Sequence, residues 1–499
     1  MWSLNRRQFL AAAAAFSRSP AASPQHRLPA TDDHYRKVRG YVEDVPVPEY
    51  RWASSRAYEA FRDIKFGVRI HWGIYSIQAL PGESWPFLTM SWPERQRYQE
   101  RYRKWNPTGF DAAGWMNLFA DAGMKMFAFT TKHHDGFSLF DTKTRVLRRA
   151  NYLAPGGPAM EPCNLSYSIM ETPFRRDVVG ELVSEARKRG IKIDFYFSHP
   201  DWYDADFRPY NDHPLQTPSS PELDDARKRM GNLLVMTPDP SPAEVDRMMA
   251  RHRRQLEELL TNYGPIDMVC LDQWLGPAVW PRLRETILRL RQLQPDVMLR
   301  ARGIGNYGDY YTPEGFTPGD KENTDVPWFV IHSLGDSFSY DANDHYKGAS
   351  WIVHSLVDAV AKGGNFMVGV GPDGDGRFHP TAVAQLREAG AWLRVNGEGI
   401  YSTRPREGSL WKQGDGIRFT RSKDGRFIFA FLLVWPGARV QLPGVRPRPG
   451  SEVRMLGYPA PLTWTADPAA GLIIQMPGPL QDEAKRPCRS AWTLRIAAA

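Results

Sequence analysis

The sequence predicts a (β/α) barrel similar to a TIM barrel, followed by a C-terminal all-β sandwich. Between residues 60 and 395, short apolar segments typical of strands alternate with amphipathic segments typical of helices. This alternation indicates a parallel sheet covered by helices. A region of about 330 residues suits a barrel with insertions better than a small open sheet. After residue 400, short apolar runs between Gly and Pro turns indicate a sandwich.

The predicted barrel strands are short and apolar. They cover residues 66–71, 126–131, 191–198, 268–272, 297–302 and 366–370. The predicted helices between them cover residues 111–122, 176–189, 242–263, 281–293 and 350–361. Ser241 and Glu244 predict a capping box for the third helix, and Pro242 suits its first turn. Residues 145–172 and 203–240 show little periodicity, so we expect them to be binding-site loops.

The two ends of the chain differ from the barrel region. The predicted sandwich strands cover residues 417–420, 427–433, 440–443, 453–455, 473–476 and 492–496, and the domain boundary is expected near 401–406. At the other end, Arg6-Arg7 and Phe9-Leu10 precede a short apolar run and a zone of small residues. This arrangement resembles a twin-arginine export signal.

We therefore expect an export signal at residues 1–30, a catalytic barrel at 31–400 and a sandwich at 401–499. The protein would be exported to the periplasm or the extracellular space. No run in the sequence reaches the ~18 apolar residues that a bilayer span needs.

Composition narrows the function classes. The chain has 499 residues with 42% hydrophobic content, and 12% of the residues are aromatic, including 17 Trp. Flat aromatic rings pack well on sugar faces, although most of the Trp are expected in the core. The net charge is +8, with Arg6, Arg7, Arg18 and Arg27 inside the predicted signal, so a nucleic-acid partner is not expected.

The three cysteines, Cys163, Cys270 and Cys488, are odd in number and widely spaced. Their spacing argues against a zinc site and against a disulfide framework. A single bridge between Cys163 and Cys488 stays open, because spacing alone neither supports nor excludes it.

Polar residues follow the predicted strands at the end where each strand finishes. In chain order they are His71, the run from Lys132 to Asp135, Ser198-His199, Asp272 and Arg302. The carboxyl ends of barrel strands open on one face, and barrel active sites are built there. The sequence therefore predicts an active site at this face.

Two carboxyl groups are the predicted catalytic pair. Asp272 ends an apolar strand, where an acid is costly to bury unless it is paired or functional; its alternative role is to cap the next helix. A retaining glycosidase places a second carboxyl about 5–5.5 Å from its nucleophile. Glu314 is the candidate for this second acid, with Glu322 and Asp320 in reserve.

The histidines at the predicted active face have two interpretations. His71, His133 and His134 could hold a zinc ion together with Asp135 and Asp272. However, adjacent residues of an extended segment point in different directions, and no regular ligand spacing is present. Neutral histidine donates and accepts hydrogen bonds, which suits sugar hydroxyls. We therefore expect sugar binding, with no metal and no cofactor.

Several segments resemble the family 29 α-L-fucosidases. Segments 66–73 (FGVRIHWG), 131–137 (TKHHDGF), 195–198 (FYFS) with Asp201-Trp202, 263–265 (YGP) leading to Asp272, and 356–371 (LVDAVAKGGNFMVGVG) carry the resemblance. It covers roughly residues 55–405, and the second and last of these segments are quite specific. The region after it fits the family's usual C-terminal domain.

This resemblance implies a retaining α-L-fucosidase that acts on fucosylated oligosaccharides or glycoconjugates. Asp272 would be the nucleophile, Arg302 would keep it ionised, and Glu314 would be the acid/base with a raised pKa. The residues implied in sugar binding are His71, His133, His134, Tyr196 or Phe197, Trp202, Trp274, Arg302, Glu83 and Trp85. An extra residue, Ser84, separates the last two compared with the family's Glu–Trp pair.

The sequence departs from the family pattern at three places. Cys270-Leu271-Asp272-Gln273 stands where Trp-Phe-Asp-Gly is usual, and Arg300-Ala301-Arg302 stands where Asn-Asp-Arg is usual. Phe329 follows Trp328 where many members have the acid/base Glu, a residue whose position shifts within the family. The alternatives are a glycosidase for another 6-deoxy or galacto-configured sugar, and a sugar-binding protein that has lost catalysis.

Overall fold

The computed structural model describes residues 28, 33–79, 81–208, 213–216, 239–314, 316–318 and 326–499. Apart from Leu28, the predicted export signal lies outside this part of the chain. The same is true of the reserve acids Asp320 and Glu322, and of most of the predicted loop at 203–240.

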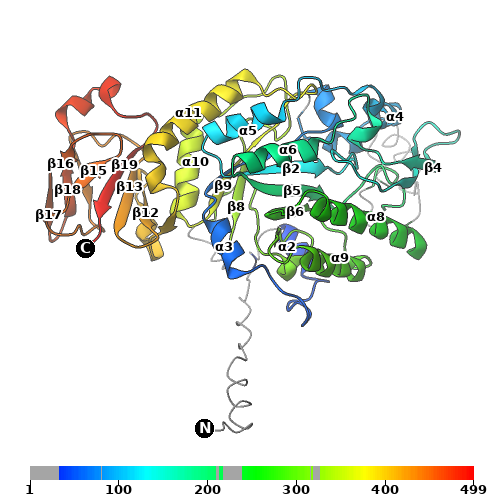
Figure 1. Ribbon diagram of the computed structural model, residues 1–499, viewed down its shortest axis with the longest axis horizontal. Helices are drawn as coiled ribbons and strands as arrows, with labels where there is room; N and C mark the ends of the chain where they lie inside the picture. The colour runs from blue at the N-terminus through cyan, green and yellow to red at the C-terminus, as the bar shows by residue number, and fades with distance from the viewer. Residues whose placement is uncertain are drawn as a thin grey trace, which may run out of the picture.

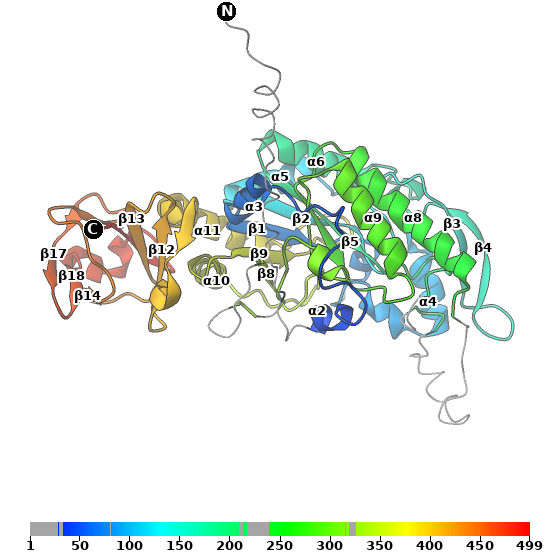
Figure 2. The same cartoon turned by 90° about the horizontal axis from the view of Figure 1, so that it is seen from below.

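A seven-stranded parallel sheet confirms the predicted barrel (Figure 1). Its order is β7-β6-β5-β2-β1-β9-β8, with every neighbouring pair parallel. The strands are β1 (Phe66–Ile70), β2 (Met126–Lys132), β5 (Lys192–Ser198), β6 (Met268–Asp272), β7 (Met298–Leu299), β8 (Phe329–Ser333) and β9 (Asn365–Val370). The surrounding helices are α5 (Ala112–Asp121), α6 (Val178–Lys188), α8 (Pro242–Thr261), α9 (Trp280–Leu293), α10 (Ala349–Ala361) and α11 (Pro380–Asn396) (Figure 2).

Successive side chains along a strand point to opposite faces, so the barrel has an outer and an inner apolar core. In β2, Phe127 and Phe129 belong to the large core shared with the helices, whereas Met126 and Ala128 belong to a smaller cluster. That smaller cluster also contains Phe61 of α3 (Ser55–Arg62), so α3 packs at the same interior. Both faces of each strand are therefore buried, as expected for a barrel wall.

The helix caps follow the sequence signals. The predicted capping box at the start of α8 is present, because the Ser241 hydroxyl accepts from the Glu244 N–H and the Glu244 carboxylate accepts from the Ser241 N–H. Pro242 occupies the first position of the helix. These bonds satisfy backbone donors that the helix itself cannot pair.

The barrel closes through an irregular segment between β7 and β8. Tyr310 forms an isolated parallel bridge with Arg300, Tyr311 with Trp328, and Glu314 with Ile331. Residues 310–314 therefore fill the position between the two edge strands. Strand β7 is much shorter than the predicted 297–302, and β8 was not predicted.

Several other elements were missed or misjudged. The insert at 145–172, expected as a loop, contains an antiparallel hairpin of β3 (Val146–Asn151) and β4 (Ala159–Leu165). Helix α11 was not predicted. The short helix α2 (Asp33–Val38) precedes the barrel, and helix α4 (Trp92–Gln99) follows strand β1; neither was predicted.

The C-terminal region confirms the predicted sandwich. One antiparallel sheet has the order β10-β12-β13-β19-β15-β16, with β11 beside β12, and the other has the order β14-β18-β17. The strands are β10 (Thr403–Pro405), β11 (Lys412–Gln413), β12 (Ile417–Ser422), β13 (Phe427–Leu432), β14 (Arg439–Leu442), β15 (Val453–Met455), β16 (Pro461–Leu462), β17 (Trp464–Asp467), β18 (Gly471–Gln475) and β19 (Trp492–Ala497). A separate apolar cluster fills the space between these sheets.

The sandwich is fixed to the barrel through α11. Phe429 and Phe431 of β13 belong to the barrel's large core cluster rather than to the sandwich's own. Trp392 of α11 is buried and its indole N–H donates to the Ala491 carbonyl at 2.8 Å. The two regions therefore share one apolar contact surface.

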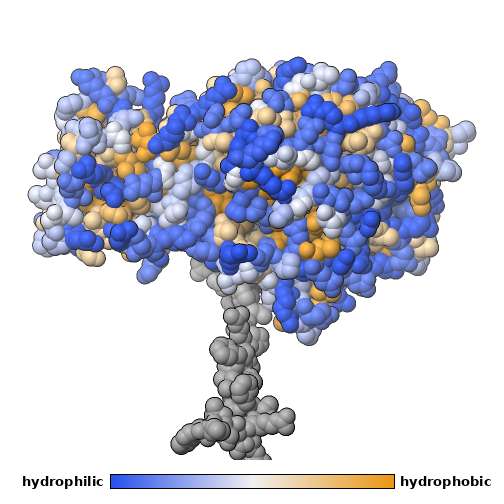
Figure 3. Space-filling model, in the orientation of Figure 1, coloured by the Kyte–Doolittle hydropathy of each residue, from blue (hydrophilic) through white to orange (hydrophobic). Residues whose placement is uncertain are grey.

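The face of the molecule in Figure 3 is mostly hydrophilic, with apolar residues scattered among polar ones. Among the described residues, the exposed large hydrophobic side chains include Trp85 and Phe316, which lie at or near the predicted site. No helix in the described part of the chain is both long enough and apolar enough to cross a bilayer.

The Trp392 contact gives a stability test. Trp392→Ala should lower the free energy of unfolding by roughly 3–5 kcal/mol, because it removes a buried aromatic side chain and leaves a cavity. Thermal and urea denaturation would measure this change. Trp411, a partly buried residue of the sandwich region, is the control, and Trp411→Ala should cost much less. Equal effects of the two changes would contradict the role given to Trp392.

Candidate active site

A cavity of about 380 Å³ opens at the carboxyl ends of the barrel strands. Its lining residues are Arg69, His71, Glu83, Trp85, His133, His134, Tyr196, Asp272, Gln273, Arg302, Glu314, Ile331 and Phe338. Every predicted site residue is in this set except Trp202 and Trp274. The cavity therefore brings together predicted site residues that lie up to 243 positions apart in the chain, from His71 to Glu314.

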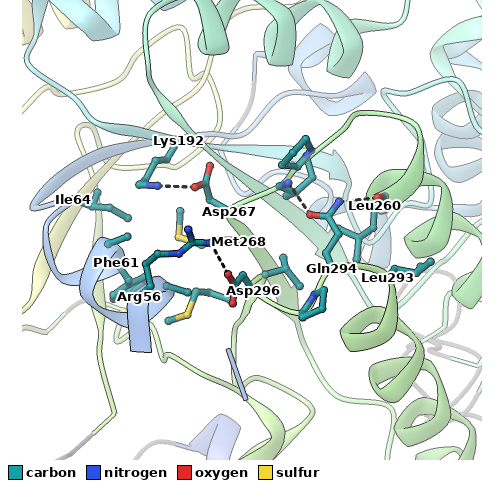
Figure 4. Close-up of a pocket in the computed structure, with 17 residues that line it drawn as sticks. Arg56, Phe61, Ile64, Lys192, Leu260, Asp267, Met268, Leu293, Gln294 and Asp296 are labelled. Carbon is teal, nitrogen blue, oxygen red and sulfur yellow. Dashed lines mark hydrogen bonds and ion pairs between the residues drawn. The ribbon is translucent and has the colours of Figure 1, made fainter. Parts of the chain in front are cut away.

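A larger cavity of about 770 Å³ lies at the opposite ends of the strands (Figure 4). Its charged residues are already paired: Lys192 contacts Asp267 at 2.6 Å, and Arg56 contacts Asp296 at 3.0 Å. The Asp267 carboxylate also accepts from the backbone N–H of Ile193. The residues predicted for catalysis thus line the smaller cavity.

Asp272 is held by donors on both of its carboxylate oxygens. Arg302 Nη1 lies 2.8 Å and Arg300 Nη1 3.3 Å from Oδ1, and the Tyr196 hydroxyl donates to Oδ2 at 2.6 Å. Burial alone would raise the pKa of Asp272, but Arg302 and Arg300, with the smaller effects of His134 and the Tyr196 hydroxyl, outweigh it and hold this pKa well below its usual range. Asp272 is therefore an oriented carboxylate at neutral pH.

Glu314 shares both arginines with Asp272. Arg302 Nη2 lies 2.8 Å and Arg300 Nη2 3.0 Å from Glu314 Oε1. Burial raises the pKa of Glu314, but Arg302 and Arg300 more than reverse this effect and lower the pKa to about 2. This differs from the raised pKa expected for an acid/base, because Arg300 contacts Glu314 in addition to Arg302, and no local sequence pattern indicates that contact.

Glu83 has the opposite electrostatic environment. Burial raises its pKa to about 7, and the nearby carboxylates Glu314 and Asp272 act in the same direction. Its carboxylate accepts from the Ser339 N–H at 3.1 Å, and its own N–H donates to the Ser339 hydroxyl at 3.1 Å. Glu83 adopts a φ of 50°, a left-handed conformation that these paired bonds hold in place.

The histidines of the site are buried and neutral at pH 7. Burial lowers the pKa of His71 and His133 well below the ordinary 6.5, and that of His134 to about 4. The Ser198 hydroxyl donates to the Pro200 carbonyl at 3.1 Å, so it must accept from His134 Nδ1. His134 Nε2 is then a lone-pair acceptor, and it lies 4.0 Å from Asp272 Oδ2.

The extra Ser84 also has a position at the site. It is fully buried, and its hydroxyl bonds to His133 Nδ1, so it orients that ring. Trp85 begins a 3₁₀ helix at Trp85–Leu88 and packs edge-on against His134, with ring centroids 4.8 Å apart. Trp85 is 42% exposed, which places it at the mouth of the cavity.

Two of the predicted sugar-binding residues lie behind or beside the cavity. Trp202 is buried and contacts His134 and Trp85 from behind, with ring centroids 5.3 and 5.5 Å away. Trp274 lies under the ammonium group of Lys37 of α2, which is 3.8 Å from its ring centroid.

Sequence reasoning missed several residues of this cavity. Arg69 lies inside β1, and Phe338 follows β8, a strand that was itself not predicted. Arg300 was noted only as a departure from the family pattern. The signal that could have found Arg69 and Arg300 is their charge, since an arginine inside an apolar strand requires a buried partner.

The described residues contain no group of three or more His, Cys, Asp or Glu that could hold a metal ion. Cys163, Cys270 and Cys488 are all free thiols, so the open question of a bridge between Cys163 and Cys488 is answered in the negative.

Two carboxylates on shared arginines, set among neutral histidines and aromatic rings at the carboxyl face of a barrel, define the site of a glycoside hydrolase. The comparisons agree. The model of the α-L-fucosidase family matches residues 45–398, and that of the α-L-fucosidase C-terminal domain matches residues 412–497. The chain belongs to the α-L-fucosidase family.

Its relatives match nearly their whole length. Tissue alpha-L-fucosidase of Homo sapiens is 28% identical over 480 residues, which is 90% of this chain and 91% of the relative. The structure of alpha-L-fucosidase isoenzyme 1 from Paenibacillus thiaminolyticus has a TM-score of 0.72 at 27% identity, covering 89% of this chain and 99% of that one. A GH29 alpha-L-fucosidase from Bacteroides thetaiotaomicron shares the fold at 22% identity, with a TM-score of 0.69 over 91% and 98% of the two chains.

Proposed function

We propose that this enzyme hydrolyses terminal α-L-fucosides of oligosaccharides or glycoconjugates with retention of configuration. The observation that carries the proposal is the shared arginine pair. Asp272 and Glu314 contact opposite nitrogens of the same Arg302 guanidinium, at 2.8 Å each. Groups one guanidinium apart suit the separation of about 5–5.5 Å that double displacement requires. The family membership and the named activity of the relatives support fucose as the sugar.

In the first step, an oxygen of Asp272 attacks the anomeric carbon, and the glycosidic C–O bond breaks. Glu314 gives its proton to the departing oxygen. In the second step, Glu314 takes a proton from water, which attacks the same carbon and releases Asp272. Glu314 is the more exposed of the two carboxyls, with 37% of its side chain accessible against 10% for Asp272, so it is the one that faces the leaving group. Arg302 and Arg300 keep it ionised in the free enzyme, so in this proposal it takes up its proton when the substrate binds. The leaving group must depart through the exposed end of the cavity.

The remaining lining residues are proposed to bind the sugar. His134 Nε2 and Asp272 Oδ2 are both acceptors 4.0 Å apart, so a sugar hydroxyl could donate to either. His71, His133, Trp85 and Glu83 would complete the contacts. No step uses a metal or a cofactor, so chelators should leave the activity unchanged.

The nucleophile is tested by Asp272→Ala, which should abolish hydrolysis of an aryl α-L-fucoside, with added azide restoring part of the turnover. Azide is small enough to enter the space left by the carboxylate and to attack the anomeric carbon. Asp267→Ala is the control and should retain activity, because Asp267 immediately precedes the same strand and lines the other cavity. Wild-type hydrolysis by Asp272→Ala would sink the assignment.

The proton donor is tested by varying the leaving group. Glu314→Gln should slow hydrolysis of a phenyl fucoside about 10²–10⁴-fold, yet leave a dinitrophenyl fucoside nearly unaffected, because that leaving group departs without a proton. Glu83→Gln should affect both substrates alike. Steady-state kinetics would measure these effects. If Glu83→Gln shows the leaving-group dependence instead, Glu83 is the donor.

We also propose that the protein is exported by a twin-arginine route, on the basis of Arg6-Arg7 and the apolar run after them. Replacing both arginines with lysine should keep the protein in the cytoplasm of a bacterial host. Cell fractionation with a fucosidase assay would show this. The unchanged chain should appear in the periplasm, and equal distribution of both forms would contradict the proposal.

A further inference from the structure

Arg300 occupies a position that links the parts of the site. It is fully buried at the end of the short β7, at the point where the closing segment pairs through Tyr310. Its Nη1 lies 3.1 Å from Cys270 Sγ and 3.3 Å from Asp272 Oδ1, and its Nη2 lies 3.0 Å from Glu314 Oε1. One side chain thus contacts both carboxylates of the proposed mechanism and the strand that carries one of them.

Two departures from the family pattern meet at this contact. Cys270 stands where the resemblance predicts Trp, and Arg300 stands where it predicts Asn. Cys270 Sγ accepts from Arg300 and also from Arg69 Nη2 at 2.8 Å. A small side chain at position 270 leaves room for a guanidinium group, which a tryptophan ring would fill. The two changes are therefore sterically matched.

Arg300 is one of the two cations that set the charge balance around Glu314. The groups that act on it electrostatically are the cations Arg302 and Arg300, the carboxylates Asp272 and Glu83, and the histidines His71 and His134. Because burial keeps both histidines neutral, Arg302 and Arg300 are the cations of this set that contact the carboxylates. Arg69 also lines the cavity, but its guanidinium bonds to Cys270 Sγ, so removing Arg300 takes away one of the two cations paired with Asp272 and Glu314.

We propose that Arg300 is a positioning residue that joins Glu314 to Asp272 and sets the pH range in which this chain hydrolyses its substrate. This inference rests on the proposed double displacement. Activity requires Asp272 ionised and Glu314 protonated, so both limits of the pH profile depend on this arginine. Each apparent pKa belongs to the coupled pair rather than to one residue.

The test compares the pH dependence of kcat/KM for a phenyl α-L-fucoside in four variants. Arg300→Gln removes a cation from both carboxyls, which favours their protonated forms, so both limbs should move to higher pH by roughly one to three units. Arg300→Lys keeps the charge but lacks the fork that spans both carboxylates, so its shift should be smaller. Arg291→Gln and Arg291→Lys are the matched controls, because Arg291 of α9 is also buried but pairs with Asp309. Their limbs should stay in place, even if their stability falls.

A second measurement covers the case in which Arg300→Gln is too unstable or too slow. Labelling of Asp272 by 2-fluoro-fucosyl fluoride needs no proton donor, because fluoride leaves unaided, so its pH dependence reports the nucleophile alone. Mass spectrometry of Arg300→Lys and of the unchanged chain would give the two midpoints. A higher midpoint in Arg300→Lys supports the inference. Unmoved midpoints and limbs would overturn it, whereas failure of the unchanged chain to hydrolyse or label would reject the proposed function itself.

Discussion

The ion pairing of Asp272 is the interaction on which the site depends. A carboxylate inside a barrel loses its hydration, and it stays ionised only if fixed positive charge and hydrogen bonds replace the water. Here Arg302 and Arg300 supply the charge and the Tyr196 hydroxyl supplies a donor, so the oxygens are oriented as well as ionised. Arg300 follows β7 directly and Arg302 comes two residues later. A shift of the end of that strand would therefore move both arginines away from the carboxylate.

The buried histidines of the site are neutral groups that are also held by fixed hydrogen-bond partners. Burial removes their charge, and buried serine partners hold the rings, His134 through Ser198 and His133 through Ser84. Because the Ser198 hydroxyl already donates to the Pro200 carbonyl, the proton of His134 lies on Nδ1, and this ring offers an acceptor to a ligand. The cavity therefore presents hydrogen bonds of set direction rather than a general polar surface.

The regular parts of this fold follow from sequence periodicity, whereas the irregular parts do not. Strands such as β2, β5 and β6 are apolar runs that end in polar residues, so their existence and their shared face were predictable. Strand β8 has only three apolar residues, Phe329 to Ile331, shortly after Pro327, which is too short a run to be recognised as a strand. The β3–β4 hairpin is held largely by charged pairs such as Arg149 with Glu161, so it lacks the apolar alternation typical of strands. Helix α11 contains Gly390, and glycine weakens a helix prediction. The glycine is required in the structure because a Cβ there would lie 2.2 Å from the Asp121 carbonyl oxygen.

Within the site, strand-end residues could be predicted and pairings could not. Asp272, His133 and His134 were marked by their position after apolar strands. Arg300 follows the short strand β7, and Glu314 lies in the closing segment. Their contact joins two irregular stretches of chain, and no local sequence pattern indicates it. The lowered pKa of Glu314 follows from that contact, which is why the sequence suggested a shift in the opposite direction.

The closing segment also bears on how such a barrel can diverge. Asp272 belongs to a strand paired on both sides, so an insertion or deletion near it would shift the register of its neighbours. Glu314 lies on a stretch joined to the barrel by single bridges, where the chain can gain or lose residues at little structural expense. The stretch that carries Glu314, the proposed proton donor, can therefore change in length while the position of Asp272, the proposed nucleophile, stays fixed, which suits an acid/base whose position shifts within the family.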